Sequence, residues 1–422
     1  MHCISLALAL SAAALVSAAP ANAKQNPICN TQDKNRPGLN AGGPAGLYWM
    51  SNEPNGNFVF TANLDNDGKM LFGDAVYAGG NGAHMGPDTS KPNPLQSQGS
   101  VKVVGDKLVV VNAGSDTASV FQIDFQNPAF IRMIGQPIST QGNFPVSATI
   151  DVTTGNACIL NAGEKNGVSC YTVDLRKGLV PIPNSVRSLN LKLKTPPENP
   201  DNTPSQILFS DDGKRLFASV KGSKDNTGFL AVWTVNDDGS LSPDFEKNVP
   251  NGGANPASLT VVRGADALMN TDIGKGLNIF DFTKSNNNKT KAETQDFQVG
   301  GSSHVAWGEF SDATRNYYIS DSDTATYTEL SIDPKNPNNV KGVKQYPQKK
   351  GSFPIDQEVV LINGKDHAYL LSPGAMTMQI LDLVAPGDAQ QRDSFDLTQA
   401  AKNIGVTLNA ANMQGVNAFF TG

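Results

Sequence analysis

Short apolar runs occur in pairs along this chain, and the turns beside them are rich in Gly, Asn and Asp. In each pair the first run has three or four apolar residues and ends on a small polar residue. These closing residues are Thr61, Asn112, Asn161, Ser219, Asn270, Ser320 and Ser372. They recur at intervals of roughly fifty residues, a spacing that leaves room for four short strands per repeat. The pattern predicts an all-β fold, namely a seven-bladed β-propeller of four-stranded antiparallel blades.

The repeats also predict the domain organisation. A single four-stranded sheet cannot bury both of its faces, so successive sheets must stack around an axis and cover one another. That packing explains why the strands read as short, nearly continuous apolar runs. We expect one propeller domain over residues 41–422, preceded by an irregular arm over residues 24–40. The C-terminal stretch Gly415–Phe420 is expected to join the first blade and close the ring.

The N-terminus has the pattern of a secretory signal peptide over residues 1–23. An apolar run, Ile4–Val16, is followed by Ala-Asn-Ala at positions 21–23, which fits a signal-peptidase site. His2 is the only basic residue before the run. No later stretch reaches the 18 or so apolar residues that a membrane span requires. We therefore predict a secreted, extracellular or cell-surface-associated protein without a membrane span.

Composition narrows the range of partners. The chain has 33 Lys+Arg against 39 Asp+Glu, a formal net charge of -6. Nucleic-acid binding needs clustered cations, so this balance excludes a basic nucleic-acid binder. We expect a monomer whose partner is a small carboxylated or lactone ligand, or an extracellular carbohydrate or protein.

The cysteines favour a disulfide over a metal site. Cys158 and Cys170 flank a predicted hairpin turn at Asn166-Gly167, and an oxidising compartment would let them pair. Cys29 is left over, either free or paired between chains. No Cys-x-x-Cys motif is present and histidine is scarce, so no metal site is predicted. Asn288 begins the sequon Asn-Lys-Thr in a polar run, which predicts a glycosylated surface loop.

The chain resembles a known family, and the resemblance covers nearly all of the residues after the signal peptide. The segments that carry it are Pro94–Val101 (PLQSQGSV), Ser205–Gly213 (SQILFSDDG), Phe217–Gly222 (FASVKG), Gly228–Trp233 (GFLAVW), Val343–Pro347 (VKQYP) and Tyr369–Pro373 (YLLSP). They are similar to the lactonase-type seven-bladed propellers, in particular the secreted fungal 3-carboxymuconate cyclase-like proteins. The resemblance implies the opening or closing of lactone rings on carboxylated substrates without a redox cofactor. Similar fungal proteins are surface glycoproteins and adhesins.

Two residues are candidates for proton transfer. In a propeller, the innermost strand of a blade begins on the face where the second strand ends, and loops on that face form the ligand mouth. His304 and Asp356 lie at the same offset before Ser320 and Ser372, near the starts of two innermost strands. His304 would donate the proton, and Asp356 would orient the His304 imidazole. The alternatives are a hydrogen-bonded structural imidazole and a turn carboxylate, which are common roles for these residue types.

Polar residues at comparable positions are candidates for substrate binding. Gln98, Gln206 and Asn255 precede or begin innermost strands, while Asn112, Asn161 and Asn270 end second strands. Lys221 follows a second strand and is assigned to a substrate carboxylate. His84 lies in a Gly-rich stretch, 79–86, which is interpreted as a surface loop or a lid.

The predicted mouth is poor in cations. Its loops carry Asp116, Glu164, Asp225, Asp272, Asp321 and Asp323 against Lys165, Lys221, Lys224 and Lys275. Recognition of a tricarboxylate favours Arg, but Arg215, Arg263 and Arg315 precede second strands and belong on the opposite face. An acidic pore could instead hold a cation through oxygen ligands.

Two functions from different classes remain. The first is a binding or surface glycoprotein with a degenerate 3-carboxymuconate cyclase-like site, for which the Arg-poor mouth is the motivating observation. The second is an active cofactor-independent lactonase or carboxymuconate lactonising cycloisomerase that uses His304, Asp356 and Lys221.

Overall fold

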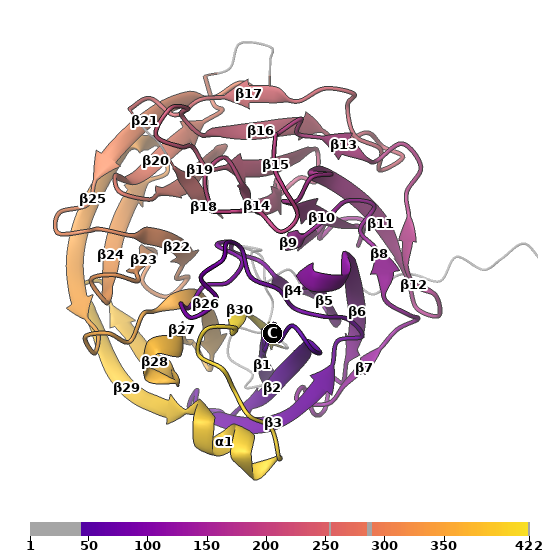
Figure 1. Cartoon of the computed structure of the whole chain (residues 1–422). Helices are drawn as coiled ribbons and strands as arrows, with labels where there is room; N and C mark the ends of the chain where they lie inside the picture. The colour runs from indigo at the N-terminus through magenta and orange to yellow at the C-terminus, as the bar shows by residue number, and fades with distance from the viewer. Residues whose placement is uncertain (1–43, 253–254, 285–288, 421–422) are drawn as a thin grey trace, which may run out of the picture.

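The computed structural model describes residues 44–252, 255–284 and 289–420. Over these residues the chain forms a ring of seven antiparallel sheets around a central axis (Figure 1). The predicted seven-bladed propeller is thereby confirmed. The predicted signal peptide and arm, the leftover Cys29 and the glycosylation site Asn288 lie outside the described residues.

Each blade has four strands, ordered outward from the axis, and two blades carry one extra short strand. Blade 1 has β30 (Gln414–Phe420), β1 (Ala45–Met50), β2 (Phe58–Leu64) and β3 (Met70–Tyr77). Blade 2 has β4 (Val101–Val104), β5 (Lys107–Asn112), β6 (Thr117–Ile123) and β7 (Ile131–Met133), with β8 (Ile138–Ser139) also on β6. Blade 3 has β9 (Pro145–Ile150), β10 (Ala157–Asn161), β11 (Gly167–Asp174) and β12 (Gly178–Pro181), with β13 (Arg187–Ser188) also on β11. Blade 4 has β14 (Pro204–Phe209), β15 (Arg215–Val220), β16 (Phe229–Thr234) and β17 (Glu246–Asn248).

Blade 5 has β18 (Pro256–Val261), β19 (Ala267–Asp272), β20 (Gly276–Asp281) and β21 (Glu293–Gln298). Blade 6 has β22 (Val305–Phe310), β23 (Tyr317–Asp321), β24 (Thr326–Asp333) and β25 (Asn336–Pro347). Blade 7 has β26 (Ile355–Ile362), β27 (Lys365–Ser372), β28 (Thr377–Ala385) and β29 (Asp388–Asp396). The short helix α1 (Leu397–Asn403) follows blade 7. The seven innermost strands contact one another in sequence around the axis and enclose a space that we call the hub.

The last strand of the chain closes the ring. β30 pairs antiparallel with β1, with Leu47 opposite Ala418 and Ala45 opposite Phe420. The C-terminal strand is thus the innermost strand of a blade whose other strands come from the N-terminal part of the chain, as the C-terminal pattern predicts. In Figure 1 β30 lies beside β1, close to the centre of the ring.

The first repeat was assigned one strand too far along the chain. Its closing residue, Thr61, lies in β2, the third strand from the axis, and the second strand of blade 1 is β1. The other six closing residues lie in second strands, as expected. The connection between β3 and β4, Ala78–Ser100, is unusually long, so β2 rather than β1 falls at the common spacing.

Burial on both faces of the sheets holds the blades together. All six residues of β9 and all six of β14 are buried, as the continuous apolar runs predict. Trp49, Trp233 and Trp307 are at most 1% exposed. These side chains are therefore part of the core and are unavailable as surface contacts.

The predicted disulfide joins two neighbouring strands. Cys158 on β10 lies directly opposite Cys170 on β11, and the two sulfurs are bonded. The bond therefore fixes the register of the hairpin that forms the middle of blade 3.

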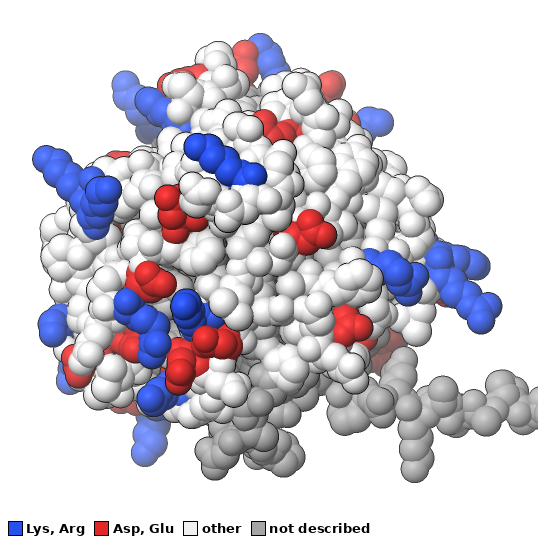
Figure 2. All heavy atoms as spheres, turned by 90° about the horizontal axis from the view of Figure 1, so that it is seen from below, with Lys and Arg blue, Asp and Glu red and all other residues white. Residues whose placement is uncertain are grey.

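The rim of the ring carries charges of both signs. Figure 2 shows Lys and Arg side chains interspersed with Asp and Glu on one side of the ring. That face therefore presents no broad area of a single charge. Within residues 44–252, 255–284 and 289–420, no helix is long and apolar enough to cross a membrane.

Candidate functional site

The mouth of the hub lies where the innermost strands begin. Val305, the first residue of β22, pairs with Asp321, the last residue of β23, so the start of one strand and the end of the next share a face. His304 immediately precedes β22, and Lys221 immediately follows β15. Both residues are therefore at the mouth, at the positions that the repeat pattern indicates.

Part of the connection between blades 1 and 2 (Ala78–Ser100), which we call the hub segment, lies in the hub. It contains no strand, yet Leu95 and Ser100 are fully buried and Ser97 is 2% exposed. In Figure 1 this dark purple loop crosses the centre of the ring toward β22 and β26. His84 belongs to the same segment and is 7% exposed, with a ring nitrogen bonded to the amide oxygen of Asn412. The interpretation of this stretch as a surface loop is therefore wrong.

Three successive backbone carbonyls of the hub segment are bound by side chains of different blades. Lys221 Nζ donates to Gln96 O at 2.7 Å, from blade 4. Gln414 Nε2 donates to Ser97 O at 3.0 Å, from blade 1. Ser147 Oγ donates to the next carbonyl, of Gln98, at 2.7 Å, from blade 3. Inward-pointing polar side chains of three blades thus serve the backbone of this segment.

The side chain of Gln98 continues across the hub to blade 6. Its Nε2 donates to Glu309 Oε1 at 3.1 Å and to Gly308 O at 3.4 Å. Gln98 was predicted as a substrate-binding residue of an innermost strand. The structure places it in the hub, but on the connection that precedes β4, and its amide is bonded within the protein.

His304 and Lys221 lie close enough to influence each other electrostatically. Burial lowers the pKa of His304, Asp323 and Asp321 oppose that shift, and Lys221 adds to it. Lys221 is 2% exposed, and burial lowers its pKa to about 7. Both the imidazole and the amine are therefore less readily protonated than they would be in water.

Asp356 is in the hub but does not pair with His304. It lies at a bulge in β26 with φ +48°, is 1% exposed, and accepts a hydrogen bond from Gln357 N at 3.2 Å. Burial and, to a smaller extent, the neighbouring Glu309 raise its pKa to about 8. Among the described residues, the charged neighbours of His304 are Asp321, Asp323 and Lys221. His304 and Asp356 therefore do not form the predicted pair, because Asp356 lies beside Glu309 instead.

Carboxyl groups dominate the deeper part of the hub. Burial raises the pKa of Glu309 to about 7, while Lys102 and Arg263 oppose the shift. Burial also raises the pKa of Glu358, whose carboxylate accepts a hydrogen bond from Asn417 Nδ2 at 2.5 Å. A polyanion placed beside these groups would add like charge to a buried site, which is unfavourable.

Three predicted binding residues have side chains that are bonded within the protein, and a fourth, Asn255, is bonded through its backbone. Asn112 Nδ2 bonds to Ser119 Oγ at 3.2 Å and Asn270 Nδ2 to Ser258 O at 2.7 Å, both within their own blades. Gln206 Oε1 accepts from Leu259 N at 2.6 Å and so links blade 4 to blade 5. The backbone N–H of Asn255 donates to Asp272 at 3.0 Å.

Asn161 is the predicted binding residue that borders a sizeable cavity. The cavity has a volume of about 480 Å³, opens beside the β10–β11 turn, and is also lined by Glu164, Lys165 and Arg187. The Asn161 amide itself is buried and donates to Thr140 O at 3.2 Å. This cavity belongs to the loops of blade 3 and contains none of the hub residues.

Several acidic residues of the mouth hold loops in place. Asp321 accepts hydrogen bonds from the backbone N–H groups of Ser303, His304, Asp323 and Thr324 at 2.6–3.0 Å. Asp116 accepts from Phe144 N at 2.7 Å. The predicted acidic lining is thus partly engaged by backbone donors and is less available to a ligand than the sequence suggests.

Cations do not converge on the mouth in the described part of the chain. Arg263 lies at the opposite end of the hub, beside Tyr317 and 3.5 Å from the Asp211 carboxylate. The same part of the chain contains no group of three His, Cys, Asp or Glu residues that could hold a metal ion. An axial cation therefore stays a prediction.

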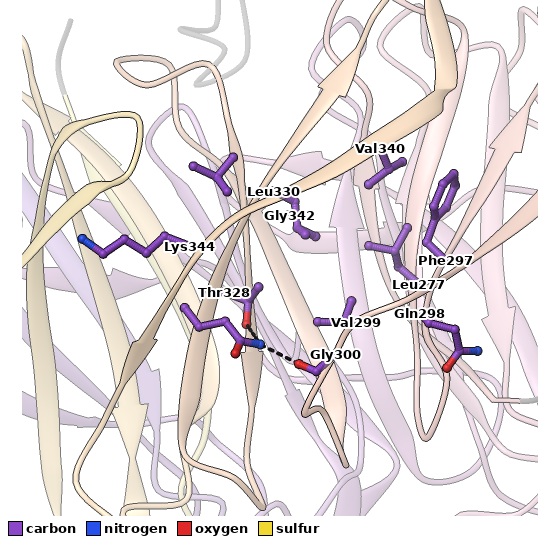
Figure 3. A pocket seen from close by; sticks show the side chains of 12 residues that line it. Leu277, Phe297, Gln298, Val299, Gly300, Thr328, Leu330, Val340, Gly342 and Lys344 are labelled. Atoms are coloured by element: carbon purple, nitrogen blue, oxygen red, sulfur yellow. Dashed lines mark hydrogen bonds between the residues drawn. The ribbon is translucent and has the colours of Figure 1, made fainter.

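A second concave feature lies outside the hub. A groove of about 290 Å³ separates the outer strands of blades 5 and 6 and is lined by apolar residues such as Leu277, Phe297 and Leu330. Figure 3 shows these side chains, with the amide of Gln345 bonded to Gly300 O at 2.8 Å. None of the predicted site residues borders this groove.

The sequence interpretation missed the residues that define the hub, namely Glu309, Glu358, Gln414 and the hub segment. Glu309 and Glu358 are ionisable residues within apolar innermost strands, a signal that marks a polar axis. Pro94–Val101 was recognised among the family segments, although it contributes only Val101 to a strand. A connection of this length without secondary structure is itself a sign of a functional loop.

Comparison with known proteins identifies the fold alone. No family model matches the sequence, and no curated protein sequence matches it. A putative 6-phosphogluconolactonase from Bacteroides fragilis has a TM-score of 0.60 at 13% identity, covering 91% of this chain and 100% of that one. The periplasmic gluconolactonase of Pseudomonas aeruginosa has a TM-score of 0.62 at 15% identity, covering 84% and 96%. A protein from Lactobacillus plantarum has a TM-score of 0.63 at 12% identity, covering 90% and 100%. The chain thus has the fold of the lactonase-type seven-bladed β-propellers.

Proposed function

We propose that this chain is a secreted lactonase-type β-propeller glycoprotein that binds a ligand and carries a degenerate 3-carboxymuconate cyclase-like site. The observation that supports this proposal most strongly is the bond of Gln98 to Glu309 across the hub. Residues of the chain's own hub segment bond to side chains inside the hub, and buried carboxyl groups lie where a tricarboxylate would need cations.

The test is a turnover screen of the purified, folded protein. We expect no ring opening or closing of 3-carboxymuconate, muconolactone or gluconolactone above the uncatalysed rate, with an active lactonase as positive control. Enzyme-dependent turnover that scales with protein concentration would overturn the proposed binding function.

A second candidate, a cofactor-independent lactonase or lactonising cycloisomerase, is favoured by one observation. Lys221 and His304 lie at the mouth with lowered pKa values, which suits general acid–base chemistry. On this alternative His304→Ala abolishes turnover, whereas His367→Ala leaves it unchanged, because His367 is bonded to Asp382 within blade 7.

The proposed export and glycosylation are tested independently. N-terminal sequencing of protein from a culture medium should begin at Lys24. Treatment with an amidase that removes N-linked glycans should lower the mass of the secreted protein, and Asn288→Gln should remove that difference. Secretion without either result would contradict these two assignments.

A further inference from the structure

The hub offers a set of hydrogen-bond donors for the backbone that follows a turn, in which Gln96 N donates to Asn93 O at 3.3 Å. Lys221 serves Gln96 O, Gln414 serves Ser97 O and Ser147 serves Gln98 O. These donors come from three blades, so their spacing is set by the rigid ring and not by the segment they hold. Three successive carbonyls met by separate donors are a pattern of backbone recognition, in which main-chain bonds provide affinity and pockets provide specificity.

Side chains of the hub segment occupy separate positions within the same site. Leu95 is fully buried, and its backbone N–H donates to Gln414 Oε1 at 3.3 Å. Ser97 Oγ donates to Val146 O at 2.8 Å, and the Gln98 amide reaches Glu309. These three positions therefore accept one apolar and two neutral polar side chains, and Asn93 and Pro94 are buried beside them.

The chemistry of the hub disfavours a charged ligand. Glu309, Asp356 and Glu358 are buried there with raised pKa values. Neutral carbonyl and amide groups add no charge to this environment, whereas a carboxylate would repel these groups when they are ionised. An uncharged, carbonyl-rich chain is the occupant that these groups favour.

The hub segment is built in a way that permits its release. It is held by side-chain bonds and isolated backbone bonds, and not by a strand ladder. Asn93 and Gln96 have φ values of +68° and +50°, conformations that cost free energy in residues other than glycine. The stretch from Pro87 to Lys91, which precedes the buried part of the segment, is exposed.

We propose that the hub is a binding site for an uncharged peptide that forms a turn, and that the chain's own Asn93–Gly99, which turns at Pro94–Leu95, occupies this site until an external peptide displaces it. The inference rests on the proposed binding function and assigns to it a site and a ligand class. The propeller thereby carries its own competing ligand, which raises the concentration of free peptide needed for binding.

The direct experiment replaces the segment that lies in the hub and then adds the same sequence as a free peptide. In an open-hub variant, residues 93–98 are replaced by a Gly/Ser sequence of equal length, while Gly99 is kept because its φ is +83°. The probe is a blocked synthetic peptide with the sequence Asn-Pro-Leu-Gln-Ser-Gln-Gly, residues 93–99 of this chain. We expect saturable calorimetric binding to the open-hub variant and at least tenfold weaker binding to the unmodified protein.

A matched control identifies the donors. Adding Lys221→Met to the open-hub variant should weaken peptide binding about tenfold, because it removes one buried hydrogen-bond donor. Lys224→Met, at an exposed position three residues away, should leave it unchanged. Absence of binding to a folded open-hub variant, equal binding by the unmodified protein, or no effect of Lys221→Met would each overturn the proposal.

Hydrogen exchange on the unmodified protein tests release without any substitution. The amides of Leu95 and Gly99 should exchange at least tenfold faster than those of Phe217 and Ala218 in β15, which pairs with a strand on each side, through an opening that denaturant does not promote. Exchange only through global unfolding would show that the segment is a permanent part of the core and would overturn the proposal. Turnover of a lactone would instead overturn the proposed function. The peptide-binding proposal is decided separately, by the calorimetric and exchange results.

Discussion

Gln98 and Glu309 meet across the axis of the ring, with 3.1 Å between the amide nitrogen of one and the carboxylate oxygen of the other. They are separated by 211 positions in the sequence and belong to opposite sides of the hub. This contact joins a connecting loop to the innermost strand of blade 6. It also places an ionisable group in a buried position whose free energy depends on pH.

Glu309→Gln should remove part of the pH dependence of stability. The pKa of Glu309 is raised to about 7 by burial, so its favourable contribution is complete below its ordinary pKa and is lost as pH rises through about 7. Between pH 5 and pH 8 the unfolding free energy of the unmodified protein should fall by roughly 1–3 kcal/mol more than that of the variant. Urea denaturation of both proteins at these two pH values measures the difference. Parallel pH profiles would contradict the assignment.

Lys221→Met should also remove part of the pH dependence of stability, but a part with the opposite sign to that removed by Glu309→Gln. Burial lowers the pKa of Lys221 from its ordinary value of 10.5 to about 7. Its contribution to stability is therefore lost as pH falls through about 7, when the buried amine becomes charged. From pH 8 to pH 6 the unmodified protein should lose more stability than the variant, in the same denaturation measurement. The exposed Lys224→Met serves as control and should follow the unmodified protein, so a matching effect there would exclude burial as the cause.

The fold could be predicted because its signal is repeated. Each of the runs ending at Asn112, Asn161, Ser219 and Asn270 is weak alone, but their common spacing favours one architecture. The first repeat was assigned to the wrong strand because the hub segment lengthens the connection to blade 2. As a result, β1 does not lie at the common spacing. Periodicity therefore revealed the number of blades but not the assignment of every strand.

The site could be predicted only in part. His304 and Lys221 were placed at the mouth by their offsets from strand ends, which the rigid ring preserves. The contact between Gln98 and Glu309 depends on how an irregular loop turns through the hub, and no period in the sequence describes that path. Asp356 was paired with His304 because both begin innermost strands, but a bulge in β26 places it beside Gln414 and Glu309 instead.

Removal of the disulfide should destabilise blade 3. The bond between Cys158 and Cys170 closes a loop with a sequence separation of 12, and such loops contribute about 2–4 kcal/mol in the chain-entropy model. The double substitution Cys158→Ala/Cys170→Ala should lower the unfolding free energy by that amount, measured by urea denaturation. Reduction of the unmodified protein is the matched control and should give a similar loss. An unchanged denaturation midpoint in both would show that blade packing alone fixes this hairpin.

Asp321 should be the acidic residue that holds the loop carrying His304 in place. Its carboxylate accepts hydrogen bonds from Ser303 and His304 before β22 and from Asp323 and Thr324 after β23. Asp321→Ala leaves these buried or half-buried N–H groups without their acceptor, which should cost about 2 kcal/mol or more of unfolding free energy. It should also broaden or shift the His304 ring signals in NMR spectra, because the loop that carries the imidazole loses its anchor.

Asp323→Ala is the matched control, since its side chain is exposed and bonds to Ser303 Oγ at 3.3 Å. It should change stability by no more than about 0.5 kcal/mol. Because Asp323 favours the charged form of His304, this variant should lower the pKa of the imidazole further while leaving its backbone in place. The two variants therefore separate anchoring of the His304 loop from the electrostatic effect on its ring. Equal effects of both substitutions on stability would show that Asp321 contributes charge to the mouth and does not hold its loops.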